Sequence, residues 1–391
     1  MRRVSVFGAT GSIGQNTLDL IARAPAEYSV IALTGGGNVA QLAADARRLR
    51  AEVAVTAFPD RLDELRAALH GSGIEAAAGP SALLEAADRP ADWIMSSIVG
   101  AAGLAPGFRA LRHGTTLALA NKESLVTAGP LLLAEAAAHG ATILPVDSEH
   151  SAIFQGLVGE DISAVEKIIV TASGGGLRDW PLAALSKAGV EDAGAHPNWA
   201  MGQRITIDSA SMFNKAMELI ETKEFFGIPP EKIEAVIHPQ SIVHALVGFR
   251  DGALMAHLGA PDMRHAIGYA LHWPERRDLP VARIDLAQIA TLEFHAPDPA
   301  RYPALGIARS VMETGGAAGC VFNAAKEIAL DGFLAGRIGF MDMAGVVEAT
   351  LDGISACLAM GKPPRDLEEV LQVDHMARKH AWQMIDKMGA P

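Results

Sequence analysis

Cysteine and aromatic residues are scarce in this sequence of 391 residues. It contains 2 cysteines, Cys320 and Cys357, and Phe, Trp and Tyr together make up 5% of the chain. Two thiols are too few for a disulfide framework or a cysteine-ligated metal site in a chain of this length. Their scarcity is typical of a reducing compartment, and we expect the protein to be cytoplasmic.

Long apolar runs and blocks of like charge are absent as well. No uninterrupted apolar stretch has the length of a transmembrane helix. The opening M-R-R-V-S-V-F-G leads directly into a predicted strand and glycine turn, so we expect no signal peptide. The 33 Lys and Arg against 45 Asp and Glu give a net charge of -12 without a charged tail. We therefore expect neither nucleic acid nor membrane as a partner, whereas local amides, hydroxyls and lysines can still bind a phosphorylated ligand.

The first part of the chain alternates short apolar segments with alanine-rich helical ones. Predicted strands lie at 4–7, 30–33, 53–55, 93–99, 116–119 and 142–146, and predicted helices at 17–23 and 39–49. This alternation is typical of a parallel sheet wound with helices. Ligands of such sheets bind at the carboxyl ends of the strands.

The remainder of the chain has a different pattern. Strands at 167–171, 235–237 and 253–257 mix with helices, and a proline-bearing stretch precedes helices at 305–314, 321–334, 343–354 and 367–387. We therefore predict an α/β fold with an N-terminal Rossmann-type parallel sheet, a central α+β domain and a C-terminal helical bundle. The predicted bounds are 1–148, 149–275, 276–302 for a linker, and 303–391.

A glycine-rich turn follows the first predicted strand. Gly8-Ala9-Thr10-Gly11-Ser12-Ile13-Gly14 lies between this strand and a helix, where glycines let the backbone approach a pyrophosphate. The position favours a dinucleotide site over a plain strand-turn-helix. The second strand ends at Leu33-Thr34-Gly35-Gly36-Gly37-Asn38 without an acidic residue for a ribose hydroxyl, which favours NADP over NAD. The same turn has no Arg or Lys to bind a 2′-phosphate.

Two carboxylates follow the strand at 142–146. Asp147 and Glu149 are two residues apart, so in extended geometry they point to the same side and could hold one divalent ion. Glu218 would complete an all-oxygen ligand set suited to Mg²⁺ or Mn²⁺, with Co²⁺ as a further candidate. The alternative is a solvated turn with His150 as a capping or core histidine.

A predicted helix carries an unusual polar face. Ser211, Asn214, Lys215 and Glu218 fall at i, i+3, i+4 and i+7, a mixture that suits ligand binding better than solubility. The segment ahead of it, His196-Pro197-Asn198-Trp199-Ala200-Met201-Gly202, is interpreted as a lid loop near 194–203. The alternative is a buried loop anchor followed by a core helix.

Other polar residues are less specific. Thr171 to Gly176 offers a hydroxyl and amides to an anion, and Asn121-Lys122-Glu123 closes another strand of the first domain. His238 and His244 are expected to be structural. Lys326 and Glu327 are expected on a solvated helix face.

In order along the chain, the segments G-A-T-G-S-I-G, A-N-K-E-S-L-V, P-V-D-S-E-H-S-A-I-F-Q, T-A-S-G-G, H-P-N-W-x-M-G, D-S-A-S-M-F-N-K-A-M-E and H-P-Q-S-I-V-H resemble the 1-deoxy-D-xylulose 5-phosphate reductoisomerase family. The resemblance implies the committed reductive step of the non-mevalonate isoprenoid route. It also implies NADPH bound by the first domain, a divalent metal in a central catalytic domain, a phosphorylated sugar as substrate, and a homodimer.

The resemblance further implies roles for individual residues. Those implied to be catalytic are Lys122, Asp147, Glu149, His196 and Glu218, and the implied metal ligands are Asp147, Glu149 and Glu218. The implied substrate contacts are Lys122, Ser148, Glu149, Ser173, His196, Trp199, Met201, Ser209, Asn214, Lys215 and Glu218. The implied NADPH contacts are Thr10, Gly11, Ser12, Ile13, Gly36, Gly37, Asn38, Asn121, Glu123 and Gly202.

Two positions depart from the family pattern. Gly37 stands where many members have a basic or hydroxyl residue, and Lys326 replaces an Asn of an N-A-A-N-E helix. Two other functions compete with the resemblance. An NADP-dependent dehydrogenase of a phosphorylated aldehyde or ketone would not need the carboxylates and would work in chelator. A nucleotide-sensing regulator would bind NADP without catalysis.

Overall fold

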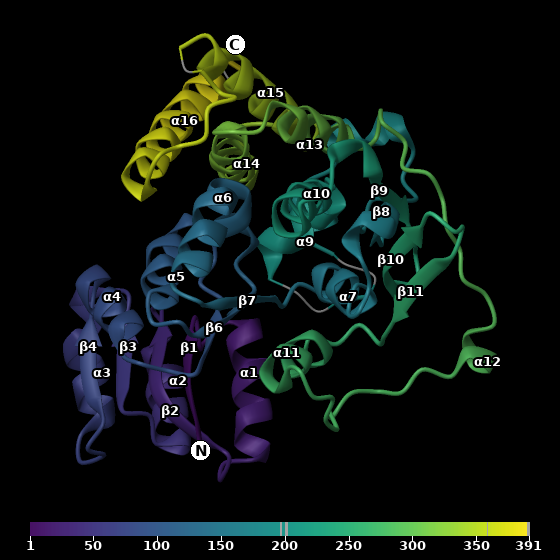
Figure 1. The fold of residues 1–391 in the computed structure, drawn as a ribbon. Coiled ribbons are helices and arrows are strands. Elements are labelled where there is room, and N and C mark those ends of the chain that lie inside the picture. The colour runs from purple at the N-terminus through teal and green to yellow at the C-terminus, as the bar shows by residue number, and fades with distance from the viewer. Residues whose placement is uncertain (196–197, 200–201, 358, 389–391) are drawn as a thin grey trace. The chain divides into compact units, whose positions relative to one another are not determined.

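The computed structural model describes the chain except for residues 196–197, 200–201, 358 and 389–391 (Figure 1). The described residues divide into two compact units. The first unit comprises Met1–Ser124, Leu132–Ser151 and Asp262–Ala282, and the second comprises Leu125–Leu131, Ala152–Pro261 and Arg283–Pro391. The chain therefore passes between the units five times, and three of these crossings lie within helices.

The first unit is built on a seven-stranded parallel sheet. Its strand order is β4-β3-β2-β1-β5-β6-β7. The strands are β1 (Arg2–Phe7), β2 (Tyr28–Gly35), β3 (Val53–Thr56), β4 (Glu75–Ala78), β5 (Trp93–Ser96), β6 (Thr116–Leu119) and β7 (Thr142–Pro145). The order reverses beside β1, as in dinucleotide-binding folds, so the crevice at the end of β1 is the expected ligand position. The predicted Rossmann-type sheet is confirmed, although β4 was not predicted.

The helices of the first unit include one from much later in the chain. The early helices are α1 (Ser12–Arg23), α2 (Val39–Leu49), α3 (Leu62–Leu69), α4 (Pro80–Asp88), α5 (Leu104–Leu111) and α6 (Lys122–Ala138). The late helix is α11 (Arg264–His272), which packs against α1, β6 and β7. The Trp93 Nε1–H donates to the Ala270 carbonyl at 3.0 Å.

This packing differs from the predicted four-part division, which placed residues 262–275 in the central domain. α11 buries Ala266, Ile267 and Leu271. These apolar side chains need an apolar surface, and within the first unit they find it against α1 and the sheet. The four-part division itself stays a prediction.

The second unit combines a mixed sheet with helices. The sheet order is β11-β10-β8-β9. Strands β8 (Val165–Ala172) and β9 (Ile233–Ile237) are parallel, and β10 (Val243–Phe249) is antiparallel to β8 and to β11 (Leu254–Leu258). Helix α7 (Ser148–Gly156) enters this unit, and the helices between β8 and β9 are α8 (Val190–Ala193), α9 (Gln203–Ala210) and α10 (Phe213–Phe226).

The C-terminal part of the second unit is helical, as predicted. A short helix α12 (Leu286–Ile289) precedes α13 (Pro303–Thr314), α14 (Ala318–Leu334), α15 (Asp342–Ser355) and α16 (Leu367–Met388). Helices α14, α15 and α16 pack against one another. Of the described helices, none is both long and apolar enough to span a membrane.

Candidate active site

The glycine turn after β1 has the backbone geometry that a pyrophosphate site requires. Gly8 has a φ of +88°, and a Cβ there would lie 2.5 Å from the Ser97 carbonyl oxygen. A Cβ on Gly14 would lie 2.3 Å from the Gly8 carbonyl oxygen. Gly11 caps α1 without a side-chain hydrogen bond, and Gly11 and Ser12 are exposed. The first-turn amides of α1 are therefore positioned to meet an anion.

The turn after β2 is open but has no basic side chain. Gly36 is half-buried, and Gly37 and Asn38 are exposed. Asn38 Oδ1 accepts from the Gln41 N–H at 3.2 Å, so Asn38 caps α2. Small residues leave room beside the Phe58 ring, which lies 3.6 Å from the position of a Gly37 Cβ. This turn has room for a cofactor ribose, but it contains no Lys or Arg that could bind a 2′-phosphate.

Asn121 and Glu123 lie together at the start of α6. The buried Asn121 amide donates to the carbonyl oxygens of Ile98 at 2.6 Å and Gly100 at 3.0 Å, and to Glu123 Oε2 at 2.8 Å. Its oxygen accepts from the Ser124 N–H at 3.2 Å, which caps the helix. Asn121 therefore fixes the loop after β5 and orients Glu123.

Asp147 and Glu149 are close together, but the predicted extended geometry is wrong. β7 ends at Pro145 and α7 begins at Ser148, so Glu149 lies in the first turn of a helix. The Ser151 N–H donates to the Asp147 carbonyl at 2.8 Å, and Asp147 Oδ1 lies 3.4 Å from the Glu149 N. The helix forms here because Asp147 is a favourable N-cap residue. Ser148 Oγ donates to Glu149 Oε2.

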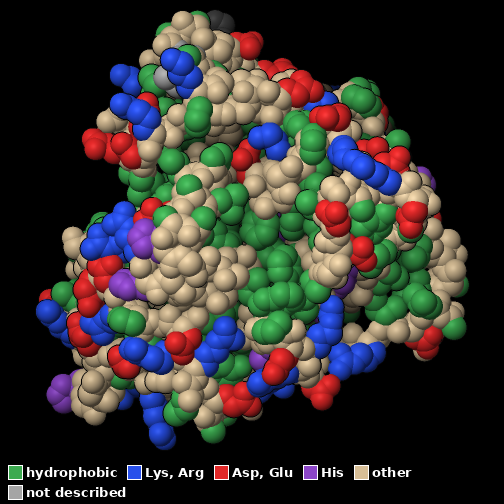
Figure 2. Space-filling view, in the orientation of Figure 1, with side chains coloured by type: hydrophobic (Ala, Val, Ile, Leu, Met, Phe, Trp, Pro, Cys, Tyr) green, Lys and Arg blue, Asp and Glu red, His purple; other side chains and the backbone are tan. Residues whose placement is uncertain are grey.

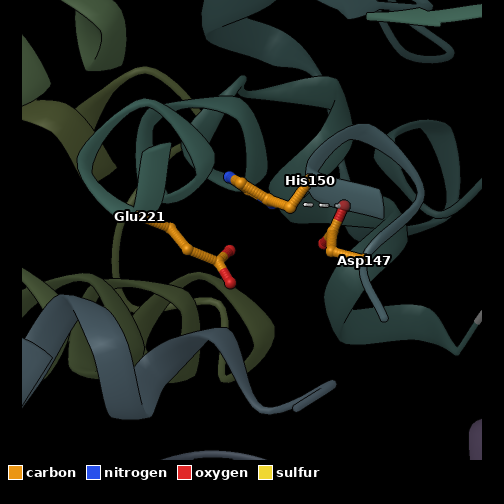
Figure 3. A group of neighbouring side chains, drawn as sticks. All are labelled: Asp147, His150 and Glu221. Atoms are coloured by element: carbon orange, nitrogen blue, oxygen red, sulfur yellow. Dashed lines mark ion pairs between the residues drawn. The ribbon is translucent and has the colours of Figure 1, made fainter. Parts of the chain in front are cut away.

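The Asp147 carboxylate is surrounded by cationic and hydrogen-bonding groups of the first unit. Lys122 Nζ lies 2.5 Å from Asp147 Oδ2. His150 Nδ1 lies 3.8 Å from Asp147 Oδ1, the contact drawn as a dashed line in Figure 3. Burial disfavours the ionised carboxyl, but the Lys122 charge and the interactions with His150 outweigh it. Together they hold the pKa of Asp147 well below its usual range. Asp147 is therefore anionic at neutral pH. The sequence offered His150 only as a capping or core histidine, and its position one helical turn after Asp147 could have indicated this contact.

Helix α10 carries a second polar cluster, in the second unit. The Asn214 amide donates to Glu218 Oε1 at 2.6 Å, and Lys215 Nζ donates to Glu218 Oε2. Lys215 and Glu218 are buried, at 3% and 1% exposure. One more turn along the helix, the buried Glu221 was also missed by sequence reasoning. The cluster combines an amide, an ammonium and carboxylates on one helix, as predicted for residues 214, 215 and 218.

Ser211 does not belong to this face, so the predicted single helix over residues 211–218 is wrong. Ser211 ends α9, and its Oγ donates to the Ile207 carbonyl at 2.9 Å. Met212 has a left-handed φ of +63° and separates α9 from α10. Met212 is buried in a core with Ala172, Ile237 and Tyr302, and this packing imposes the break.

The glycine-rich loop after β8 lies against the end of α9. Ser173 Oγ accepts from the Gly175 N–H at 3.1 Å. Gly175 has a φ of +71°, and a Cβ there would lie 2.4 Å from the Ala210 Cα and 2.8 Å from the Ser209 carbonyl oxygen. The structure therefore brings Ser173 and Ser209 to neighbouring segments, as an oxyanion site requires.

The described residues of the predicted lid loop contact the β9–β10 connection. The Asn198 amide donates to the Pro239 carbonyl at 2.6 Å and to Ser241 Oγ at 2.9 Å. The Trp199 ring lies 6.2 Å from the His244 ring. Gly202 is exposed at the start of α9. His196 and Met201 lie outside the described residues.

Lys326 and Glu327 were expected on a solvated face, and for Lys326 this is wrong. Lys326 is 5% exposed and lies 2.9 Å from Asp208 of α9. Glu327 is half-buried and pairs with Arg378 at 2.7 Å. On the face of the molecule in Figure 2, basic and acidic side chains are interspersed. Binding of a phosphate would therefore depend on individual nearby amides, hydroxyls and lysines rather than on a large basic surface.

The sheet has the Rossmann strand order and a glycine turn after β1, and an ionised Asp147 lies beside a second carboxylate, Glu149. With the cluster of hydroxyl, amide and ammonium groups in the second unit, these features define a nicotinamide-dependent oxidoreductase. Three family models then match the chain. They are 1-deoxy-D-xylulose 5-phosphate reductoisomerase at residues 4–129, its C-terminal domain at 143–226, and the DXP reductoisomerase C-terminal domain at 258–380. The chain belongs to the 1-deoxy-D-xylulose 5-phosphate reductoisomerase family.

Relatives and solved structures agree with this assignment. The 1-deoxy-D-xylulose 5-phosphate reductoisomerase of Jannaschia sp. (strain CCS1) is 77% identical, over 97% of each chain. That of Ruegeria pomeroyi is 71% identical, over 97% of this chain and 96% of the relative. The Zymomonas mobilis enzyme in complex with NADPH is 47% identical, with a TM-score of 0.92 over 98% of this chain and 99% of that chain. A DOX-P reductoisomerase in complex with NADPH, fosmidomycin and magnesium is 39% identical, with a TM-score of 0.94 over 99% of both chains.

Proposed function

We propose that the protein converts 1-deoxy-D-xylulose 5-phosphate to 2-C-methyl-D-erythritol 4-phosphate, using NADPH and a divalent metal ion, in non-mevalonate isoprenoid biosynthesis. Family membership over nearly the whole chain carries the proposal. Solved relatives are complexes with NADPH and with magnesium. The protein would act in the cytoplasm, since its two cysteines fit a reducing compartment.

The residues of this chain fit a divalent ion. Asp147 is held ionised, and Glu149 and Glu218 are further carboxylates, a hard-oxygen donor set that suits Mg²⁺, Mn²⁺ or Co²⁺. We assign these three residues as its ligands. When bound, the ion supplies Lewis acidity toward substrate oxygens, and NADPH supplies the hydride.

The remaining assignments concern the substrate. Lys122 keeps Asp147 anionic, and Lys122 and Ser148 would orient the reacting end of the substrate. The phosphate would be bound by Ser173, His196, Ser209, Asn214 and Lys215. Trp199 and Met201 would cover the bound substrate and exclude water. The assigned NADPH contacts are Thr10, Gly11, Ser12, Ile13, Gly36, Gly37, Asn38, Asn121, Glu123 and Gly202.

The activity is tested by following the near-ultraviolet absorbance of NADPH. Purified protein is mixed with 1-deoxy-D-xylulose 5-phosphate and Mg²⁺ or Mn²⁺, with a chelator as control. We expect metal-dependent oxidation of NADPH and the branched polyol phosphate as product. Turnover that persists in chelator would instead indicate a simple dehydrogenase, and NADPH binding without any oxidation would indicate a sensor.

We further propose that the protein is a homodimer, as the family resemblance implies. In support, β11 is one of the two edge strands of the second unit's sheet. It carries two large apolar side chains that are about half exposed, Leu254 at 53% and Met255 at 44%. An exposed apolar edge strand is a favourable surface for pairing with a second chain.

A further inference from the structure

Asp208 and Lys326 form a buried ion pair within the second unit. Asp208 lies on α9, one residue before Ser209, and Lys326 lies on α14 (Figure 1). Lys326 Nζ donates to Asp208 Oδ2 at 2.9 Å, and the two residues are 5% and 7% exposed. In the described part of the chain, Lys326 is the only ion-pair partner of Asp208. Removing the Lys326 charge would therefore leave a buried carboxylate without its cation.

A second ion pair joins the same two helices at the surface. Arg204 lies 2.6 Å from Asp331, and both side chains are exposed. Arg204 precedes Asp208 along α9, whereas Asp331 follows Lys326 along α14. The two helices therefore run in opposite directions where they meet. One ion pair to α14 lies near the start of α9 and the other near its end.

Ser209 is held on its other side by the glycine-rich loop. The backbone of Gly175 approaches Ser209 and Ala210 so closely that a Cβ would not fit. Ser173 lies two residues before Gly175, in the same loop. The end of α9 that carries Ser209 therefore lies between the glycine-rich loop and the ion pair to α14.

The two ion pairs differ in what they contribute. A surface pair such as Arg204–Asp331 contributes little to stability because water screens it. A buried pair loses much of its attraction to desolvation, so stability alone does not explain its presence. It does restrict geometry, because both charges must stay together once they are removed from water.

We infer that the Lys326–Asp208 pair positions Ser209 for the phosphate monoester of the substrate. Lys326 is then a positioning residue, supplied by a helix of the C-terminal bundle. The inference rests on the proposed function, in which Ser209 binds this phosphate. Ser173 and Ser209 face the same phosphate only while α9 keeps its place.

The test uses the full-length chain with Lys326→Met. At saturating NADPH and metal, we expect the KM for 1-deoxy-D-xylulose 5-phosphate and the inhibition constant for inorganic phosphate to rise by about tenfold to a hundredfold. The KM for NADPH should stay unchanged, and kcat should fall by less than about threefold. Arg204→Met is the matched control, since it breaks the surface pair between the same helices, and its KM for substrate should stay within about twofold of the wild type.

A double variant separates positioning from stability. The double variant Lys326→Met with Asp208→Asn removes the uncompensated charge, so it should recover thermal stability but keep the raised KM. It also carries the test if Lys326→Met alone fails to fold. A wild-type KM in both variants, with lowered thermal stability in the single one, would overturn the inference.

Ser209→Ala distinguishes the inference from the function on which it rests. If this variant leaves the KM for substrate unchanged, the proposed phosphate role of Ser209 is wrong. If it raises that KM while the two Lys326 variants do not, only the positioning inference is wrong.

Discussion

Asp147 combines a structural and a chemical role in one side chain. It caps α7, and it is held ionised by Lys122 and His150 despite its burial. Asparagine is an equally good N-cap residue but has no charge. A substitution at this position can therefore separate the two roles.

We expect Asp147→Asn to keep the fold and NADPH binding but to lose metal-dependent turnover by about a hundredfold or more, because one anionic ligand is removed. The measurement is NADPH oxidation across a Mg²⁺ titration, with NADPH binding followed separately. Glu160→Gln is the control, since Glu160 is an exposed carboxylate beyond the end of α7. Wild-type turnover in Asp147→Asn would remove Asp147 from the metal site.

His238 is a structural histidine, as the sequence indicated. It is fully buried, its Nδ1–H donates to the Glu293 carbonyl at 2.8 Å, and its ring stacks on Phe294 at 4.8 Å. Burial lowers the pKa of His238, and Glu293 offsets this only in part. The unfolded chain therefore takes up this proton at a higher pH than the folded protein does.

It follows that His238 makes the folded protein less stable as the pH falls below about 6.5, the usual pKa of histidine. We expect His238→Gln to lose less thermal stability than the wild type between about pH 7.5 and pH 5.5. Scanning calorimetry at the two pH values measures this difference. His70 is exposed, so His70→Gln is the control and should lose as much thermal stability between the two pH values as the wild type does. An equal loss of thermal stability in all three proteins would contradict the prediction.

At the scale of elements, the bounds of helices and strands were predicted best where a single helical or strand pattern of apolar residues continued without interruption. α2 and β6 have their predicted bounds, and α16 extends one residue beyond its prediction. β4 was missed because E-A-A-A favours a helix, and pairing with β3 overrides that preference. The break at Met212 was missed because tertiary packing, and not local sequence, imposes its left-handed backbone.

The site was predictable to a similar degree. Asn214, Lys215 and Glu218 were predicted on one face because their spacing is local. The burial of Lys326 could not be predicted, since its partner Asp208 is 118 residues away in the chain. The closeness of Asp147 and Glu149 was predicted from strand geometry, but it arises because Asp147 caps the helix in which Glu149 lies.

The edge strand β11 gives a prediction at this scale. We expect Met255→Lys to convert the proposed dimer to a monomer, because a charge on the exposed edge opposes pairing with a second chain. Light scattering after size exclusion measures the mass. Lys167→Met changes the charge on β8, an interior strand of the same sheet, and should leave the mass unchanged. If Met255→Lys keeps the wild-type mass, β11 is not the dimer surface.

For the whole molecule, the chain does not complete one unit before it starts the next. The first unit takes α11 from residues beyond the sheet of the second unit. During synthesis on a ribosome, β8 to β11 are therefore all made before the helix that packs against α1 and bonds to Trp93. The first unit cannot be complete at the moment its own seven strands have emerged, and a fragment ending near residue 148 would leave the apolar surface that α11 covers exposed.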